Sequence, residues 1–428
     1  MALILTLALQ SAVPPFATDT YTPAFPQVTS DLATPASTVG LTLTLFFLGL
    51  GAGQLIGGPM SDRFGRRTPL IIGGVICTLG AIGCALAPSI GFLLTMRLVQ
   101  GVGGGIAATI SRAVVIDVAR GDLMARVMSI LMALGGLAPA IAPVIGGVVL
   151  TAGGTWRTIF WILVGFGLLM IATAASFVPE TLPRDQRHRG GLGEVIHGFR
   201  SVLRSRRFVA YMLLGAFSAF AMLGYIANAA YVLQGMNGMA PLPYSLFFAS
   251  TALAQVGLSV LNARLVGRFR PRQLIGLGLS LSAGAAVLIA LSVLLWDAAT
   301  LPLCTGFLIL MASQAFIFGN SAALAVTNVT DRAGSASALL GIVQALALAL
   351  SAPLASSGGT TTAVPMVIVI VIGVLGATGS HIAAQRPSIT RTGALPAKHQ
   401  PPTAAESEPG GRGSPRGSIT EPGGEDAN

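Results

Sequence analysis

Long runs of apolar residues alternate with short polar segments from residue 2 to about residue 384. Each run is about 20 residues long, which is the length that a helix needs to cross the hydrocarbon core of a bilayer. The runs occupy twelve windows: 2–25, 38–59, 69–88, 91–113, 127–150, 156–178, 208–233, 243–265, 273–295, 300–326, 334–356 and 362–384. The pattern predicts an all-α integral membrane protein with twelve transmembrane helices.

Two polar stretches set the expected domain organisation. The stretch 179–207 separates a six-helix half at 1–178 from a second six-helix half at 208–385. We expect this stretch to be a cytoplasmic linker with a short amphipathic helix from about Leu192 to Leu203 at the membrane surface. In residues 386–428, Pro, Gly, Ser and Glu replace the apolar runs, so we expect a disordered cytoplasmic tail.

The composition excludes several classes of protein. Apolar residues make up 53% of the 428 positions and charged residues only 9%, whereas soluble domains are about 25% charged. Lys398 is the single lysine among 25 basic residues, so the spans offer no Walker A lysine for ATP and no Schiff-base lysine. The four histidines lie in or beside polar segments. We therefore expect no enzymatic activity, no catalytic residue, no metal site and no cofactor.

The arginines predict the orientation in the membrane. Eighteen of them lie in or at the edges of the loops after even-numbered spans, and one, Arg157, follows an odd-numbered span. The positive-inside rule then places both termini in the cytoplasm, in the inner (plasma) membrane of a cell. The net charge of +10 reports this topology and not binding to nucleic acid. The first run begins at residue 2 without a polar or basic leader, which favours an upstream start codon over a cleaved signal peptide.

A short internal repeat indicates two related halves. The segment DRFGRR at 62–67 aligns with GRFRPR at 267–272 at an offset of 205 residues. Both follow the second helix of a six-helix half, as expected for a transporter of two pseudo-symmetric halves. The second copy has Gly267 in place of Asp62, so we expect a charge network in the first half only.

Several motifs, in order along residues 1–385, resemble one family. They are DTYTPAFPQV from Asp19, GGPMSDRFGRR at 57–67, RLVQGVGGG from Arg97, APVIGG at 142–147, WRTIFWI from Trp156, PETLP from Pro179 and AGSASALLG from Ala333. Together they resemble the major facilitator superfamily, in particular its drug/proton antiporters with twelve spans and the bicyclomycin-resistance (Bcr/CflA) branch. The resemblance implies two pseudo-symmetric halves around a central cavity, with energy from a proton gradient. Ala142 departs from the family's usual Gly before the proline of the span-5 motif.

Two charged residues inside spans are candidates for coupling. Asp19 is the one carboxylate within an apolar span, and a charge at membrane depth marks a functional site. Arg97 cannot lose its charge, so it must face a cavity or pair. The resemblance implies that Asp19, Arg97 and Gln100 serve proton coupling and substrate binding. The alternatives are an Asp19 that caps a helix break near the outer interface and an Arg97 that snorkels to that interface.

A loop constellation is the candidate conformational latch. We expect Gly58 to let helices approach closely, Gly65 to permit a tight turn, and Asp62 to accept from a neighbouring helix N-terminus. The resemblance implies that the constellation joins the two halves on the cytoplasmic side in the outward-open state. Its members are Gly58, Asp62, Arg63, Gly65, Arg66, Arg67 and Asp117. The alternative is a solvated loop whose arginines reflect only the positive-inside rule.

Span 5 is expected to bend and to pack closely, because it contains Pro139, Pro143, Gly146 and Gly147. The resemblance makes it the antiporter-motif helix at the interface of the halves, and generic close packing is the alternative.

Uncharged polar residues within spans are expected to be mostly interhelical hydrogen-bond partners, with two or three lining a cavity. They are Gln100, Asn228, Gln234, Gln255, Gln314, Asn320 and Gln344.

These observations predict a monomeric, proton-coupled antiporter that exports a small, partly apolar drug-like compound and so confers antibiotic resistance. The expected partners are the compound, protons and the lipid bilayer. Export of an endogenous metabolite, with incidental drug resistance, is the alternative within transport. A membrane-embedded enzyme or sensor is the remote alternative, because no catalytic grouping of His, Cys, Ser and acid lies near one interface.

Overall fold

The computed structural model describes residues 2–118, 121–183, 199–329 and 333–385, without the side chains of 121–134 and 333–335. The described residues 2–385 all belong to one compact unit. The expected linker helix at about 192–203 falls largely outside the described residues, and the expected disordered tail falls entirely outside them.

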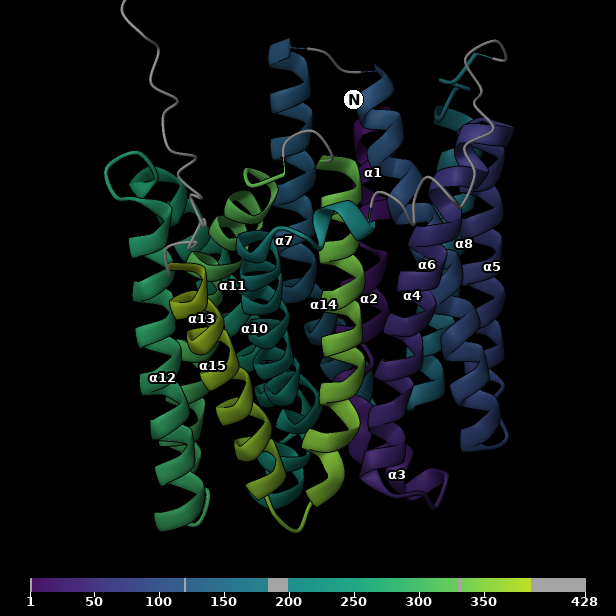
Figure 1. Ribbon diagram of the computed structural model, residues 1–428. Coiled ribbons are helices and arrows are strands. Elements are labelled where there is room, and N and C mark those ends of the chain that lie inside the picture. Colours follow the sequence, from purple (N-terminus) through teal and green to yellow (C-terminus); the bar gives the residue numbers. More distant parts are fainter. Residues whose placement is uncertain (1, 119–120, 184–198, 330–332, 386–428) are drawn as a thin grey trace, which may run out of the picture. The chain divides into compact units, whose positions relative to one another are not determined.

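The described chain is a bundle of helices (Figure 1). The first half contains α1 Ala2–Ser11, α2 Val13–Asp19, η1 Thr22–Ala24, α3 Phe25–Asp31, α4 Ala36–Phe64, α5 Arg67–Ala85, α6 Ile90–Val118, α7 Gly121–Thr151 and α8 Trp156–Phe177. The second contains α10 Arg206–Ala230, η3 Tyr231–Met236, α11 Pro241–Leu265, α12 Pro271–Leu295, α13 Thr300–Val326, α14 Ala333–Ala355, η5 Ser356–Gly358 and α15 Val364–Gln385. Among the described residues, ten helices are long and apolar enough to cross a membrane, and 2–11 and 135–151 are shorter apolar helices. The predicted all-α membrane fold is confirmed.

The first span differs from its prediction. We expected one helix over 2–25, and the structure has α1, α2, η1 and α3 in succession as far as Asp31. Pro14 and Pro15 stand at the start of α2, and Pro23 stands in η1. Proline has no N–H for the helical ladder and its ring clashes with the preceding turn, so the span breaks at these positions. The break leaves Asp19 at the end of a short helix.

Small residues bring α4 and α6 into close contact. A Cβ atom added at Gly49 would collide with the Leu98 carbonyl, and one added at Gly101 would collide with the Phe46 carbonyl. Gly53 and Gly105 repeat this pattern one turn along each helix. Such small-residue stripes replace the hydrophobic effect as the means of packing helices in a lipid environment. The contact fixes the position of α6 and of its buried arginine.

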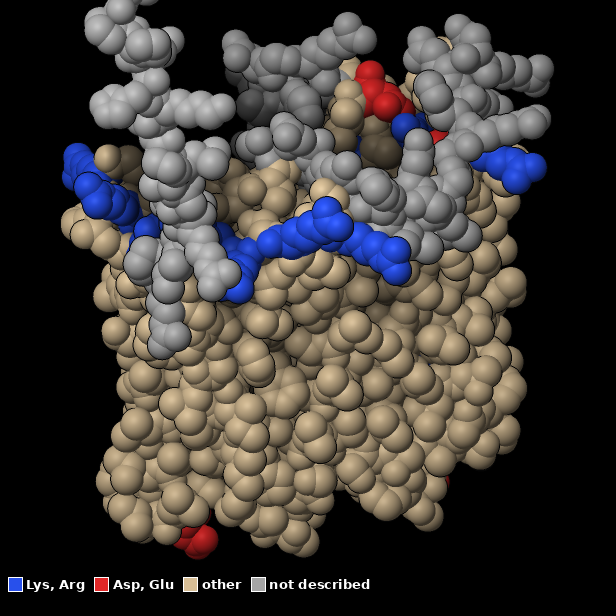
Figure 2. All heavy atoms as spheres, in the orientation of Figure 1, with Lys and Arg blue, Asp and Glu red and all other residues tan. Residues whose placement is uncertain are grey.

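The two halves meet along two helix pairs, α4 with α14 and α7 with α11. Thr29 and Tyr231 share a hydrogen bond of 2.8 Å between α3 and η3, and Gln234 Nε2 donates to the Pro23 carbonyl at 3.0 Å. These contacts join the halves at the lower end in Figure 1. Figure 2 shows the described Arg side chains of this face gathered at the other end, above a broad tan surface without charge. A band without charge between polar ends is the surface that a bilayer requires.

Candidate functional site: a cavity between the two halves

A cavity of about 260 Å³ lies between the halves. Helices α2, α4 and α7 form its wall on one side, and α10, α11, α13 and α14 form the other. Its lining comprises Pro14, Pro15, Thr18, Asp19, Phe47, Pro139, Met222, Leu223, Ile226, Phe248, Ala252, Gln255, Met311, Phe318 and Leu348. The lining is apolar apart from Thr18, Asp19 and Gln255, which is the usual composition of a small-molecule site.

Asp19 is the one ionisable side chain among these lining residues. It is only 7% exposed, and the Thr18 hydroxyl donates to its Oδ1 at 2.8 Å. Its backbone carbonyl accepts from the Thr22 hydroxyl at 3.0 Å, across the turn between α2 and η1. The proline break thus holds a carboxylate in the cavity wall with a single side-chain hydrogen bond. The sequence analysis did not name Thr18 as a site residue, although a hydroxyl next to Asp19 in the chain could have indicated a hydrogen bond to its carboxylate.

The opposite wall is aromatic and aliphatic. The Phe248 ring of α11 lies in the lining, and the Tyr225 ring of α10 stacks on it with centroids 5.7 Å apart. The Tyr225 hydroxyl lies 3.4 Å from that of Thr251. Of the uncharged polar residues expected in spans, Gln255 reaches the cavity, whereas Asn320 donates to Asn262 between α13 and α11 at 2.9 Å. One wall can therefore carry charge, and the other offers apolar contact and one amide.

Arg97 of α6 is fully buried, so the alternative of an arginine that snorkels to the interface is wrong. Its Nη1 donates to the Ala17 carbonyl at 2.9 Å and to Gln100 Oε1 at 2.7 Å. Its Nε is 3.4 Å from the Thr42 carbonyl, and its Nη2 has no partner among the described residues. Arg97 is absent from the cavity lining, so of the two expected arrangements the structure has the paired one, with the Ala17 carbonyl and Gln100 as partners.

The Arg97 guanidinium is surrounded by aromatic rings and has no carboxylate partner among the described residues. Its carbon lies 4.5 Å from the centroid of the Phe46 ring, 5.3 Å from that of Tyr21 and 5.8 Å from that of Phe160. Desolvated cation–π contacts of this kind stabilise a buried charge. Because Arg97 binds the carbonyl two residues before Asp19, it acts on the backbone of α2 in this structure and forms no ion pair with Asp19 within the described part of the chain.

The expected latch residues form a network at the arginine-rich end. Arg66 Nη1 contacts Asp62 Oδ1 at 2.6 Å, and its Nε contacts Asp117 Oδ2 at 2.9 Å. Nη1 also donates to the Ser61 hydroxyl at 2.7 Å. Burial lowers the pKa of Arg66, but the hydrogen bonds with Asp117 and Asp62 outweigh burial, so this pKa lies above its ordinary value. The Arg66 guanidinium stays charged and ties the end of α4 to α6.

The other members of the constellation have separate positions. Gly65 has φ of 91° and ends α4 in the left-handed region, as the expected tight turn requires. Arg63 lies over the Phe64 ring at 5.2 Å, and Arg67 donates to the Ala175 carbonyl of α8 at 2.6 Å. The close approach expected at Gly58 is absent in this structure, since a Cβ there would meet nothing within 4 Å. Gly57 makes that approach, because it faces α6, with Ile106 Cα 3.1 Å from an added Cβ.

Sequence reasoning missed the partner that organises this loop. Glu180, which follows α8, accepts the backbone N–H of Arg66 at 2.7 Å and that of Arg67 at 3.4 Å. A carboxylate at a helix N-terminus complements the free N–H groups and the dipole of α5. The next residue, Thr181, donates to Asp117 Oδ2 at 2.8 Å. The PETLP motif drew attention to this segment in the sequence, but only the fold shows that its Glu180 caps the start of α5.

The two span-5 glycines face different neighbours. A Cβ added at Gly146 would collide with the Thr20 carbonyl of the first span, and one at Gly147 would collide with the Ser245 side chain of α11. Pro139 lies in the cavity lining, and Pro143 is buried. Helix α7 therefore packs closely against the broken first span on one side and against the second half on the other. The described residues contain no group of His, Cys, Asp or Glu that could hold a metal ion.

Comparisons with known proteins agree with this architecture. A profile of the Major Facilitator Superfamily matches residues 7–352. The uncharacterized MFS-type transporter YdgK of Bacillus subtilis is 34% identical over 88% of this chain and 94% of its own length. The bicyclomycin resistance protein homolog of Haemophilus influenzae is 29% identical over 87% of this chain and 94% of its own length. The partially occluded, inward-open xylose transporter XylE of E. coli has a TM-score of 0.70 at 17% identity, over 88% of this chain and 96% of that chain.

The YdgK relative and the profile cover most of the chain, and the XylE comparison supports the same helical fold. The described residues form two halves of helices around a cavity. This protein is a multi-pass membrane transporter and not an enzyme, and the chain belongs to the Major Facilitator Superfamily.

Proposed function

We propose that this chain is a proton-coupled antiporter that exports a small, partly apolar compound of drug-like size by alternating access. The observation that carries the proposal is Asp19, a buried carboxylate and the one ionisable side chain in the lining of a largely apolar cavity between the halves. Relatives named for resistance to bicyclomycin, chloramphenicol and multiple drugs support the choice of cargo. The arginine-rich end faces the cytoplasm in this proposal, with both termini on that side, and the transporter works as a monomer.

The charge of the cavity defines which compounds fit. A lone carboxylate without a neighbouring cation in the lining favours a neutral or cationic compound and disfavours an anion, because a like charge in a buried site is costly. Asp19 then holds either a proton or a polar group of the compound. Asp19 releases its proton to the cytoplasm, and binding of the compound then competes with reprotonation at this one carboxylate, which is the simplest form of antiport.

The energy of one proton is sufficient for useful export. One charge that crosses a potential of 100 mV supplies about 2.3 kcal/mol, and about 1.36 kcal/mol corresponds to a tenfold gradient. One proton per cycle thus supports a gradient of roughly 50-fold. The Arg66 network with Asp62 and Asp117 is proposed as the latch that holds the loop between strokes.

Substrate-triggered proton movement in everted membrane vesicles tests this proposal, with a panel of antibiotics and dyes. Wild type and Asp31→Asn should release protons on addition of an exported compound, and Asp19→Asn should not. Asp31 is the matched control, since it lies on α3 of the same span, outside the cavity. Unchanged transport in Asp19→Asn would remove the coupling role from Asp19. No response to any compound would favour an endogenous metabolite as cargo.

A further inference from the structure

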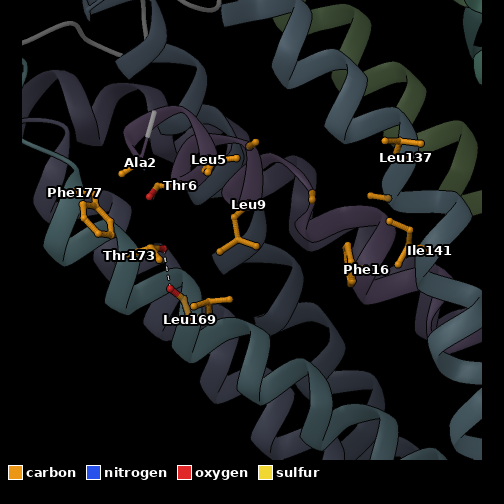
Figure 3. A pocket seen from close by; sticks show the side chains of 13 residues that line it. Ala2, Leu5, Thr6, Leu9, Phe16, Leu137, Ile141, Leu169, Thr173 and Phe177 are labelled. Atoms are coloured by element: carbon orange, nitrogen blue, oxygen red, sulfur yellow. Dashed lines mark hydrogen bonds between the residues drawn. The ribbon is translucent and has the colours of Figure 1, made fainter.

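A second and larger hollow lies on the lipid-facing side of the first half. It has a volume of about 490 Å³ and is bounded by α1 and α2, α7 and α8. In Figure 3, the side chains of α7 stand on one side and those of α8 on the other, with those of the first span between them. Its lining comprises Ala2, Leu5, Thr6, Ala8, Leu9, Ala12, Phe16, Leu137, Ala138, Ile141, Leu169, Thr173 and Phe177. We call this hollow the lateral groove.

The chemistry of the lateral groove selects an apolar occupant. None of its lining residues is charged, and its polar side chains are Thr6 and Thr173. The Thr173 hydroxyl donates to the Leu169 carbonyl of its own helix at 2.8 Å, so it is already satisfied. A compound in the groove therefore gains apolar contact and no ion pair. The volume lies within the roughly 300–1,000 Å³ of small-molecule sites.

The groove and the central cavity share their dividing wall. On α2, Phe16 lines the groove, whereas Pro14 and Thr18 line the cavity. On α7, Ala138 lines the groove and the next residue, Pro139, lines the cavity. The two hollows are thus the two sides of the same helices. A route from one to the other needs only a displacement of these two segments.

Both wall helices are weakened at this level. Pro14 and Pro15 interrupt the first span, and Pro139 and Pro143 lie inside α7. Each proline removes a backbone hydrogen bond of the helix and permits a bend. The Phe16 ring stacks on Phe166 of α8 with centroids 4.7 Å apart, which ties the first span to α8 beside the groove. The helices of the wall already lack some backbone hydrogen bonds at the prolines. They can therefore bend there without breaking a continuous series of helical hydrogen bonds.

We propose that the lateral groove is an entry site for neutral, apolar compounds dissolved in the bilayer, which pass from it into the central cavity between α2 and α7. The inference rests on the proposed export function and adds the route and the membrane-dissolved class of cargo. A water-soluble compound reaches the cavity without using the groove. A phospholipid acyl chain as a permanent occupant is the competing outcome of the test.

Two neighbouring leucines of α8 provide a matched pair of variants. Leu169 lines the groove and is 51% exposed, whereas Leu168 does not line it and is 56% exposed. Tryptophan at position 169 fills open space in the groove, and tryptophan at position 168 points elsewhere on the same lipid-facing helix. Neither substitution overpacks the core, since both side chains are half exposed.

Export of two neutral probes by whole cells forms the first arm. Leu169→Trp should slow export of the membrane-dissolved dye N-phenyl-naphthylamine about tenfold, equivalent to roughly 1.4 kcal/mol of lost binding. Export of chloramphenicol, the more water-soluble probe, should stay unchanged, and Leu168→Trp should affect neither. An equal loss for both probes in Leu169→Trp, or no loss for either, would overturn the proposal.

Photocapture in lipid nanodiscs forms the second arm and does not depend on transport. A benzophenone side chain at position 169 should capture tritiated N-phenyl-naphthylamine saturably, and excess unlabelled dye should displace it. The same side chain at position 168 should give only unsaturable capture. Capture of phospholipid at position 169 that the dye does not displace would assign the groove to an acyl chain. If wild type exports neither probe, the proposed drug-like cargo is not supported by these compounds, and photocapture alone decides whether the groove binds membrane-dissolved compounds.

Discussion

The two halves of the bundle follow one helical plan but bury different chemistry. In the first half, the described residues bury a carboxylate, Asp19, and a guanidinium, Arg97. In the second half, the described residues bury hydroxyls, amides and the imidazole of His381, but no carboxylate or guanidinium. Buried charge is costly and persists where function requires it. The first half is therefore the proposed site of coupling, and the second half supplies an apolar wall.

The loops after the second helix of each half show the same divergence. At the offset of the internal repeat, Arg66 aligns with Pro271 and Asp62 with Gly267. Helix α4 runs on to Phe64, whereas α11 already ends at Leu265. Arg66 joins two carboxylates, and the described part of the second-half loop contains no ion pair. The two copies of the repeat thus occupy the same place in their halves, after the second helix. Among the described residues, the first copy forms a charge network and the second does not.

The strongest test of this asymmetry is Arg97→Met. We expect loss of proton-coupled transport, because Arg97 holds the Ala17 carbonyl of the helix that ends at Asp19. The free energy of unfolding should fall by about 1–3 kcal/mol, since Gln100 Oε1 loses its charged donor in a buried site. Proton release in vesicles and thermal unfolding in detergent measure the two effects.

The double variant Arg97→Met/Gln100→Leu separates stability from function. It should regain part of the lost stability, because the orphaned amide is gone while the Ala17 carbonyl still lacks its donor, but it should not regain transport. Transport at the wild-type rate in either variant would show that the buried guanidinium has only a packing role.

A smaller effect is expected from Arg66→Lys. Lysine keeps the charge but cannot reach Asp62, Asp117 and Ser61 together with one ammonium group. Turnover should fall about tenfold, which corresponds to roughly 1.4 kcal/mol. Arg268→Lys in the second-half loop is the matched control and should stay near wild type. Equal losses in the two variants, measured as initial export rates, would mean that the loops are equivalent.

The smallest effects concern backbone conformation. Gly65→Ala should cost about 1–2 kcal/mol of stability, because Gly65 has φ of 91°. Gly267→Ala in the second half should cost about the same, since Gly267 has φ of 103°. Gly58→Ala should be neutral or stabilising by up to about 1 kcal/mol, since a Cβ there meets open space. Thermal unfolding of the three variants checks the order, and a large loss in Gly58→Ala would contradict it.

Much of the fold was open to prediction, because the signals for membrane helices are local. Apolar runs of bilayer length located the ten helices of the described residues that are long and apolar enough to cross a membrane, and turn residues such as Gly65 marked helix ends. The family motifs also led to the correct family. The first span was predicted as one continuous helix, with a break at Asp19 only as an alternative, because apolar length alone does not report helical continuity; Pro14, Pro15 and Pro23 were the visible signal of the break.

The sequence by itself determined the all-α membrane fold and the identity of the two buried charges, since hydropathy and charge are properties of a residue and its neighbours in the chain. Only the tertiary structure decided what surrounds those charges. It placed Asp19 in the cavity and Arg97 in an aromatic cage against the Ala17 carbonyl. It also brought Glu180 to the start of α5. These contacts join residues about 80 and 114 positions apart, and helix packing rather than any local pattern sets them.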